Sequence, residues 1–163
     1  MSAAEAIRIF RYWIPAILAA AMISVFSTGS FGENHTGKYI LPFLHWLLPG
    51  ASAHLLHRLH TAIRKMAHVI EFGLFSITVF HGIRGGRFGW RFNWALATLA
   101  IAVAYAGLDE WHQSFVPLRK ARVRDVAIDA LGAVSAQALV WFYAKWKSNS
   151  AVPPEGSAEP MEQ

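Results

Sequence analysis

The sequence predicts an all-α integral membrane protein, a bundle of four transmembrane helices with an interfacial or re-entrant segment between the first two. Charged residues make up 15% of the 163-residue chain, against about 25% in soluble domains. The apolar residues also gather in runs close to the roughly 20 residues that a helix needs to cross a bilayer. Four such runs, separated by polar segments, give the four predicted spans.

The first predicted span runs from Trp13 to Ser27 and follows Arg8 and Arg11. Positive charge before an apolar run is also the pattern of a signal peptide. No small-residue cleavage site follows the run, so we favour a retained helix. Pro15 falls in the first turn of this helix, where proline is tolerated.

The segment from Gly29 to Gly50 is predicted to be a loop that contains one apolar stretch, Tyr39 to Leu48. This stretch is only ten residues long and includes Pro42. Because it is too short to cross the membrane, we expect an interfacial or re-entrant piece.

A helical pattern begins at Ala53, and the second predicted span runs from Met66 to Ile83. This helix should therefore begin among the lipid headgroups and then enter the membrane. Its apolar and polar residues lie on opposite faces at helical spacing. The apolar face carries Leu55, Leu59, Ala62, Ile63 and Met66, and the polar face carries His57, His60, Arg64, His68 and Glu71. We expect solvent exposure, rather than a binding role, for His45, His54, His57, His60 and His81.

The third span is predicted from Phe92 to Leu108 and the fourth from about Val123 to Trp146. The tail from 148 to 163 is rich in Pro, Ser and Glu, a composition typical of disorder, so the transmembrane domain is predicted to cover 1–147. The short loop from Arg84 to Arg91 contains three arginines and no acid. By the positive-inside rule we expect this loop and both termini to be cytoplasmic, although the opposite face also carries basic residues.

Composition excludes several classes of site and partner. The chain has no cysteine, so disulfides and thiol catalysis are ruled out. The net charge is +5, but the basic residues flank apolar runs, which favours membrane lipids rather than nucleic acid as partners. No metal motif such as H-E-x-x-H occurs, so we predict no metal and no other cofactor.

Topology brings the start of the second span, the end of the third and the start of the fourth to one membrane face. Asp129 shares a helical stripe with Gly132 and Ala136, and this stripe should face the bundle because small residues allow close helix contact. Asp109 and Glu110 end a helix, where carboxylates oppose the macrodipole and need compensation by Arg119 or Arg122. The candidate polar site consists of Lys65, His68, Glu71, Asp109, Glu110, Gln113, Arg119, Arg122, Asp125 and Asp129.

Two strings in this constellation carry a family resemblance. The pattern D-E-x-x-Q-x-F-x-P-x-R begins at Asp109 and is followed by Asp125 and Gly132, and K-x-x-H-x-x-E begins at Lys65. The chain resembles the VanZ-like family, although Asp129 stands where Asn is usual and Ala136 where a second Gly is common. The resemblance implies a small multi-pass bacterial inner-membrane protein. The founding member is associated with low-level teicoplanin resistance, but the resemblance supplies no reaction.

Three hypotheses for the polar site stay open. In the leading one, Arg119, Arg122 and Lys65 bind the phosphate of an anionic lipid headgroup or lipid-linked cell-envelope precursor, and Asp109, Glu110 and Asp125 orient the arginines. In the second, the protein is an enzyme in which Glu71 or Asp109 is a general base. In the third, the cluster only locks the helices together.

Overall fold

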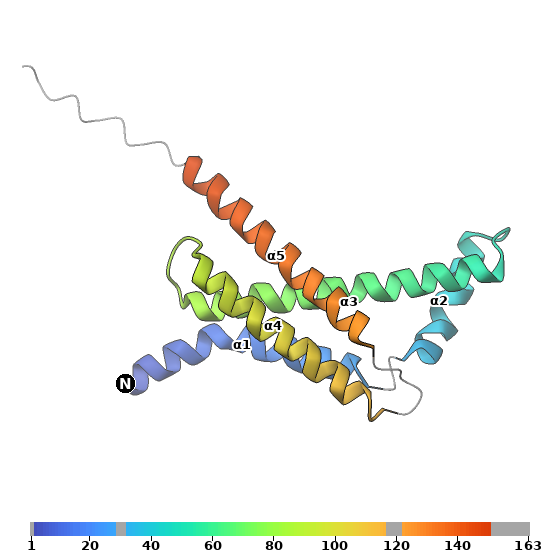
Figure 1. The fold of residues 1–163 in the computed structure, drawn as a ribbon, viewed down its shortest axis with the longest axis horizontal. Coiled ribbons are helices and arrows are strands. Elements are labelled where there is room, and N and C mark those ends of the chain that lie inside the picture. The colour runs from blue at the N-terminus through green and yellow to red at the C-terminus, as the bar shows by residue number, and fades with distance from the viewer. Residues whose placement is uncertain (1, 29–31, 117–121, 151–163) are drawn as a thin grey trace, which may run out of the picture.

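The computed structural model describes residues 2–28, 32–116 and 122–150. Within these ranges, the secondary structure consists of helices and the connections between them. All of these helices except the second are long and apolar enough to cross a membrane, which confirms the predicted four-span class. In chain order they are α1 (Ala3–Phe26), α2 (Glu33–Leu47), α3 (Ala53–Arg84), α4 (Phe92–Gln113) and α5 (Val123–Asn149) (Figure 1).

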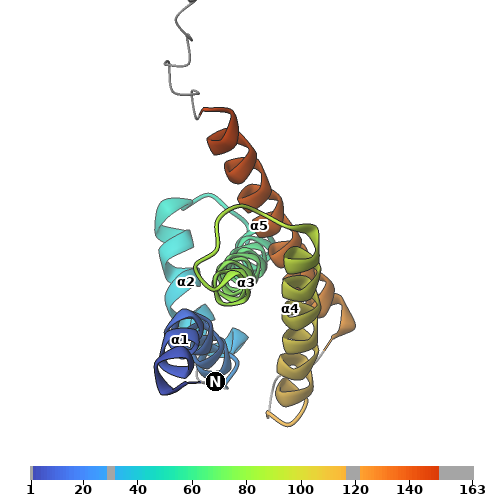
Figure 2. The ribbon, with the colours of Figure 1, turned by 90° about the vertical axis from the view of Figure 1, so that its left-hand side faces the viewer.

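Helix α3 is the central element and contacts each of the other four helices. Figure 2 shows it passing between α1 on one side and α4 on the other. Its 32 residues span about 48 Å at 1.5 Å per residue, whereas the hydrocarbon core of a bilayer is about 30 Å thick. The first turns of α3 therefore project beyond the other spans, and α2 packs against them (Figure 1).

Helix α2 corrects the predicted loop from Gly29 to Gly50, because residues Glu33–Leu47 are helical with Pro42 inside the helix. Proline removes one backbone hydrogen bond of a helix, and for this reason the sequence predicted a helix break here. Contacts with α3 offset this loss: Leu44 is buried, and Thr36 Oγ1 lies 3.2 Å from Nε2 of His60 on α3.

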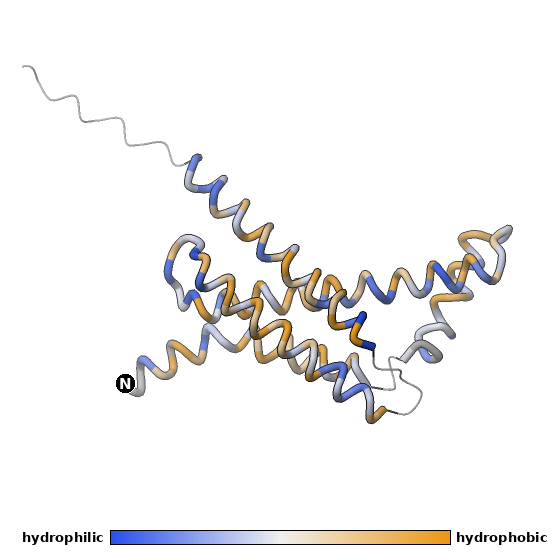
Figure 3. The backbone as a smooth tube through the Cα atoms, viewed as in Figure 1, coloured by the Kyte–Doolittle hydropathy of each residue, from blue (hydrophilic) through white to orange (hydrophobic). Residues whose placement is uncertain are grey.

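Parts of the polar face of α3 turn inward, and parts of its apolar face turn outward. Met66 is 56% exposed, whereas His60 is only 1% exposed, so the prediction of a solvated His60 is wrong. His45, His54 and His57 are exposed as expected. In a bilayer the outer surface must be apolar, so polar side chains of a spanning bundle turn toward other helices. Figure 3 shows polar and apolar residues alternating along α3.

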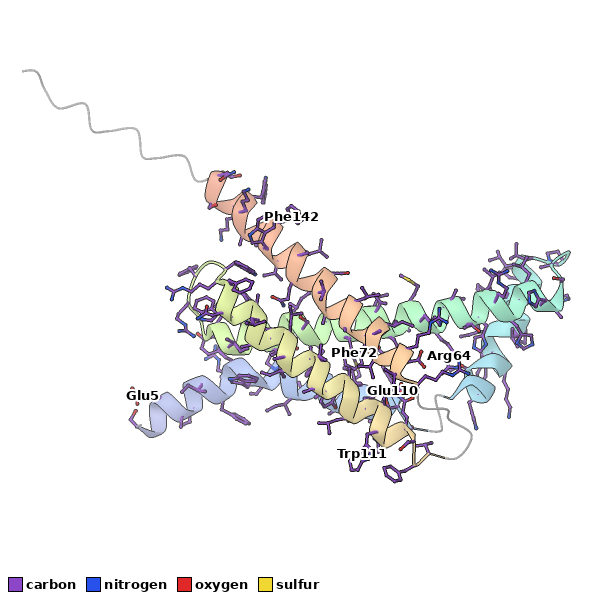
Figure 4. The ribbon with its side chains drawn as sticks, viewed as in Figure 1. Glu5, Arg64, Phe72, Glu110, Trp111 and Phe142 are labelled. Atoms are coloured by element: carbon purple, nitrogen blue, oxygen red, sulfur yellow. The ribbon has the colours of Figure 1, made fainter. Side chains whose placement is uncertain are left out.

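The apolar core lies where α1, α4 and α5 meet the second half of α3. Phe72, at the centre of this region in Figure 4, is fully buried and packs near Phe75 with an interplanar angle of 85°. The remaining buried members of the cluster are mostly small, which keeps the helices close: Ala16, Ile23, Val79, Ala102, Ala106 and Ala133.

The closest approach of two helices is that of α5 to α3 at Gly132. A Cβ atom added there would lie 2.9 Å from Val69 Cα and nearer still to the Val69 carbonyl oxygen. Ala136 is buried on the same stripe, which confirms that this stripe faces the bundle. Beyond the crossing, Ser76 Oγ donates to the Ala133 carbonyl at 3.3 Å, and Gln137 Nε2 donates to Ser76 Oγ at 2.9 Å.

We predict that Gly132→Ala destabilises the protein by about 1–3 kcal/mol, because the added methyl group has no space against the Val69 backbone. Gly107→Ala is the matched control: it also lies inside a spanning helix, but an added Cβ meets nothing within 4 Å. The control should be neutral or stabilising, since alanine favours helix by up to about 1 kcal/mol. Thermal unfolding in detergent measures both, and equal shifts would contradict the close contact.

Candidate functional site

The candidate site lies at the face of the bundle where α1 and α4 end and α5 begins (Figure 1). Blue, hydrophilic stretches of α4 and α5 mark it in Figure 3. Nine of the ten predicted site residues are described by the structure, and Arg119 lies outside the described residues.

Asp109 is the centre of a buried hydrogen-bonded group that joins α4 to the end of α1. Ser27 Oγ donates to Asp109 Oδ1 at 2.5 Å, and Gln113 Nε2 donates to Asp109 Oδ2 at 2.7 Å. One turn earlier on α4, the Tyr105 hydroxyl donates to the Ala20 carbonyl of α1 at 2.7 Å. Among the described residues, both carboxylate oxygens of Asp109 therefore accept from neutral donors.

Glu110 joins the end of α4 to the start of α5. Its Oε2 atom accepts a hydrogen bond of 2.7 Å from the backbone N–H of Arg122, the N-cap residue of α5. An N–H at a helix N-terminus favours a carboxylate, since the macrodipole is positive there. The sequence predicted compensation by the side chain of Arg119 or Arg122. Arg122 contributes its backbone instead, and its side chain is exposed. The prediction for Arg119 lies outside the described residues.

His68 and Asp129 form a third link, between α3 and α5. His68 Nδ1 lies 3.4 Å from Asp129 Oδ1. Asp129 is only 1% exposed, yet neither of its carboxylate oxygens has a hydrogen bond among the described residues. A buried carboxylate normally has hydrogen-bond donors, so the contact with His68 is the interaction among the described residues that offsets the burial of Asp129.

The other predicted residues surround these three links. Asp125 lies in the first turn of α5, and both it and Asp109 are near enough to Asp129 to interact electrostatically. Glu71 and Arg64 have the same relation to His68. Lys65 is partly exposed. The interior of the site is thus rich in carboxylates, and the cations lie at its edge.

A family model described as VanZ/LLP1 matches residues 12–144. The chain belongs to the VanZ/LLP1 family. Neither a search of curated proteins nor a search of solved structures found a significant match. The match covers all four spans and the whole polar site, so the site is part of the family domain rather than an addition to it.

In this member of the VanZ/LLP1 family, the polar site sets a histidine of α3 against a buried carboxylate of α5. Among the described residues, no group of three or more His, Asp or Glu side chains is placed to hold a metal ion. The His68–Asp129 contact is that of an imidazole oriented by a carboxylate, which leaves Nε2 of His68 available to a ligand.

Several structural partners were missing from the sequence analysis. The sequence pattern places Ser27 only at the end of the first span, and it does not pair Ser76 with Gln137. Gln137 carried a usable signal, because an amide in the middle of a spanning helix needs a partner on a neighbouring helix. The partner of Asp129 could not be named, since the register between α3 and α5 depends on the Gly132 contact.

We predict opposite effects for one substitution at two buried carboxylates. Asp109→Asn places an amide N–H₂ against a donor and should cost about 1–3 kcal/mol of stability. Asp129→Asn loses no hydrogen bond and removes a buried charge, so it should be neutral or stabilising. Thermal unfolding of both variants in detergent checks the difference. A larger loss of stability for Asp129→Asn than for Asp109→Asn would contradict the prediction that Asp109 depends more on its hydrogen bonds than Asp129 does.

Proposed function

We propose that the protein binds the phosphate-bearing headgroup of a membrane lipid or lipid-linked cell-envelope precursor at this polar face. The observation that carries the proposal is a basic groove on α3 beside the buried cluster. The groove has a volume of about 410 Å³, and its lining residues are His54, His57, Arg58, Thr61, Ala62 and Lys65.

Lys65 connects the groove to the cluster. It lines the groove, and it precedes His68 by three residues, so the two side chains lie on one face of α3. Arg58 lies two turns earlier on the same helix, and both cations lack an acidic neighbour in the groove lining. A phosphate group in the groove would contact these two cations and the Thr61 hydroxyl.

Arg122, at the start of α5, supplies a third cation. Its backbone is fixed by Glu110 at 2.7 Å, while its side chain is exposed. A guanidinium with a fixed backbone loses less conformational freedom on binding, and its fork suits two phosphate oxygens. Arg119 is proposed from the sequence to serve with it.

The carboxylates limit where a phosphate can lie. Asp109 and Glu110 are buried and accept protein hydrogen bonds, and Asp129 is buried beneath them. Negative charge in this interior repels a phosphate, so the phosphate belongs at the basic edge. A hydroxyl or ammonium group of the same headgroup could instead donate to Asp129.

Lys65→Gln should weaken the binding of phosphatidic acid by about tenfold, the equivalent of roughly 1.4 kcal/mol for one charge-assisted contact. Native mass spectrometry of the detergent-purified protein measures retention of this lipid against diacylglycerol, which lacks the phosphate. Lys145→Gln is the control, because it removes the same charge at the other end of the bundle, where Lys145 lies 5.3 Å over the Trp141 ring. Equal losses in the two variants would exclude a specific headgroup site in the groove.

An enzymatic function is the second candidate, and the His68–Asp129 contact favours it. An imidazole oriented by a carboxylate can remove a proton from a headgroup hydroxyl or water. The same mass spectra separate the two functions. Binding returns the added lipid unchanged, whereas catalysis produces a lipid of altered headgroup mass that disappears in His68→Asn.

The proposed location is the bacterial inner membrane, with the site on the outer face. Family membership supports a link to glycopeptide tolerance, since the founding member is associated with teicoplanin. The acid-free loop from Arg84 to Arg91 supports a cytoplasmic position for the opposite end.

Single cysteines test this orientation in a chain that has none of its own. Gly50 and Phe88 are both exposed and lie in the connections at opposite ends of the bundle. On intact spheroplasts, an impermeant thiol reagent should label Gly50→Cys and leave Phe88→Cys unlabelled. After lysis, both should be labelled. The opposite pattern on intact cells would place the polar site in the cytoplasm.

A further inference from the structure

A second cavity lies at the other end of the bundle, where α1 passes the end of α3. Its volume is about 650 Å³, and its walls come from two segments of the chain. One segment of α1 contributes Ile9, Tyr12 and Trp13, and the end of α3 with the following turn contributes Gly82, Ile83, Gly85, Gly86 and Arg87. Figure 2 looks at this end of the molecule and shows α1 beside the turn.

Glycines bring the two walls together. A Cβ atom at Gly82 would lie 2.8 Å from the Trp13 ring, and one at Gly86 would overlap the Tyr12 hydroxyl group. Gly86 also has a φ of 82°, a left-handed conformation that favours glycine. The aromatic rings of Tyr12 and Trp13 therefore rest directly on backbone, and their positions at the cavity edge are fixed by packing.

Arg87 is the charged group of the cavity and is held rigidly. Its Nε donates to the Arg84 carbonyl at 2.8 Å and its Nη2 to the Ile83 carbonyl at 2.7 Å, while its guanidinium lies 4.6 Å over the Trp94 ring. None of these contacts is with a carboxylate. Arg84 Nε and Trp90 Nε1, at the same end of the bundle, are buried donors with no acceptor among the described residues.

We propose that this cavity binds an anionic phospholipid, with the phosphate at Arg87 and the Tyr12 hydroxyl and the glycerol and upper acyl chains along Ile9, Trp13 and Ile83. The site is separate from the polar cluster and does not depend on the function proposed for it. It would anchor α1 to the end of α3 from the lipid side.

The size and composition of the cavity point to a lipid rather than a free phosphate ion. A bare phosphate would fill only a small part of 650 Å³ and would leave the apolar wall facing water. Aromatic residues at the ends of spans mark the headgroup level of a bilayer. Basic pockets between transmembrane helices at this level suit anionic headgroups. The segment from Arg84 to Arg91 contains no acid that would repel an anionic headgroup, so the charge of Arg87 favours an anionic lipid over a zwitterionic one.

Arg87→Gln should reduce retention of phosphatidylglycerol by about tenfold in native mass spectra of the detergent-purified full chain. Arg91→Gln is a matched control. Arg91 carries the same charge on the same loop and also lies over Trp94, at 4.9 Å, but it does not line the cavity. Wild-type protein should prefer phosphatidylglycerol to phosphatidylcholine, and inorganic phosphate alone should not compete.

Arg87→Gln also removes two hydrogen bonds at the end of α3, so a second variant keeps the test independent of folding. Ile9→Trp fills the cavity without changing charge or these bonds, and Ile7→Trp is its control, since Ile7 is exposed and does not line the cavity. Ile9→Trp should lower lipid retention and Ile7→Trp should not.

Three results would overturn the proposal: equal retention in Arg87→Gln and Arg91→Gln, equal retention of phosphatidylcholine, or competition by inorganic phosphate. Lys65→Gln tests the polar site at the opposite face separately. If both sites bind phosphatidylglycerol, the wild type carries two lipids, Lys65→Gln loses one and Arg87→Gln loses the other. A loss in only one of these variants identifies which site fails.

Discussion

The contact between Gly132 of α5 and the Val69 backbone of α3 determines where the polar groups of this bundle meet. With the two backbones touching, residues within about two turns to either side are brought together. Asp129 reaches His68 on one side, and Gln137 reaches Ser76 on the other. Lipid gives no hydrophobic drive for helices to associate, so close packing and interhelical hydrogen bonds of this kind stabilise the arrangement. The separation at one glycine therefore sets the geometry of the candidate site.

The bilayer also explains why the two ends of the bundle differ in chemistry. At one end, α4 and α5 bring carboxylates into the interior, where Ser27 at the end of α1 and the Arg122 backbone donate to two of them. At the other end, Arg87 and aromatic rings surround an open cavity without acids in its lining. The first arrangement organises buried hydrogen bonds, and the second presents charge to the lipid. Among the described residues, the two ends thus differ in the groups they offer: buried carboxylates at the first, and a guanidinium beside aromatic rings at the second.

The lengths of the apolar runs predict much of the fold. The site depends on contacts between helices, which these lengths do not reveal. Four apolar runs and the small stripe at Gly132 predicted the spans and the inward face of α5. Helical periodicity identified the polar face of α3 but not its surroundings, so His60 was expected in water although it lies against α2. Pro42 favoured a break that tertiary contact overrides. Ser27 lies 82 residues from Asp109, and no local pattern could pair them.

The hydrogen bonds of Asp109, Glu110 and Asp129 show how far a purely structural role can explain the cluster. Asp109 accepts from two neutral side chains, and Glu110 accepts from a backbone amide, so these residues fulfil the role of a helix lock. Asp129 does not, because it is buried with both oxygens unsatisfied by described residues. A lock that leaves a buried carboxylate without donors would be less stable than an apolar contact of the same size. Retaining an acid there therefore points to its contact with the titratable His68, 3.4 Å away, or to a further donor from a headgroup, a water molecule or a part of the chain outside the described residues.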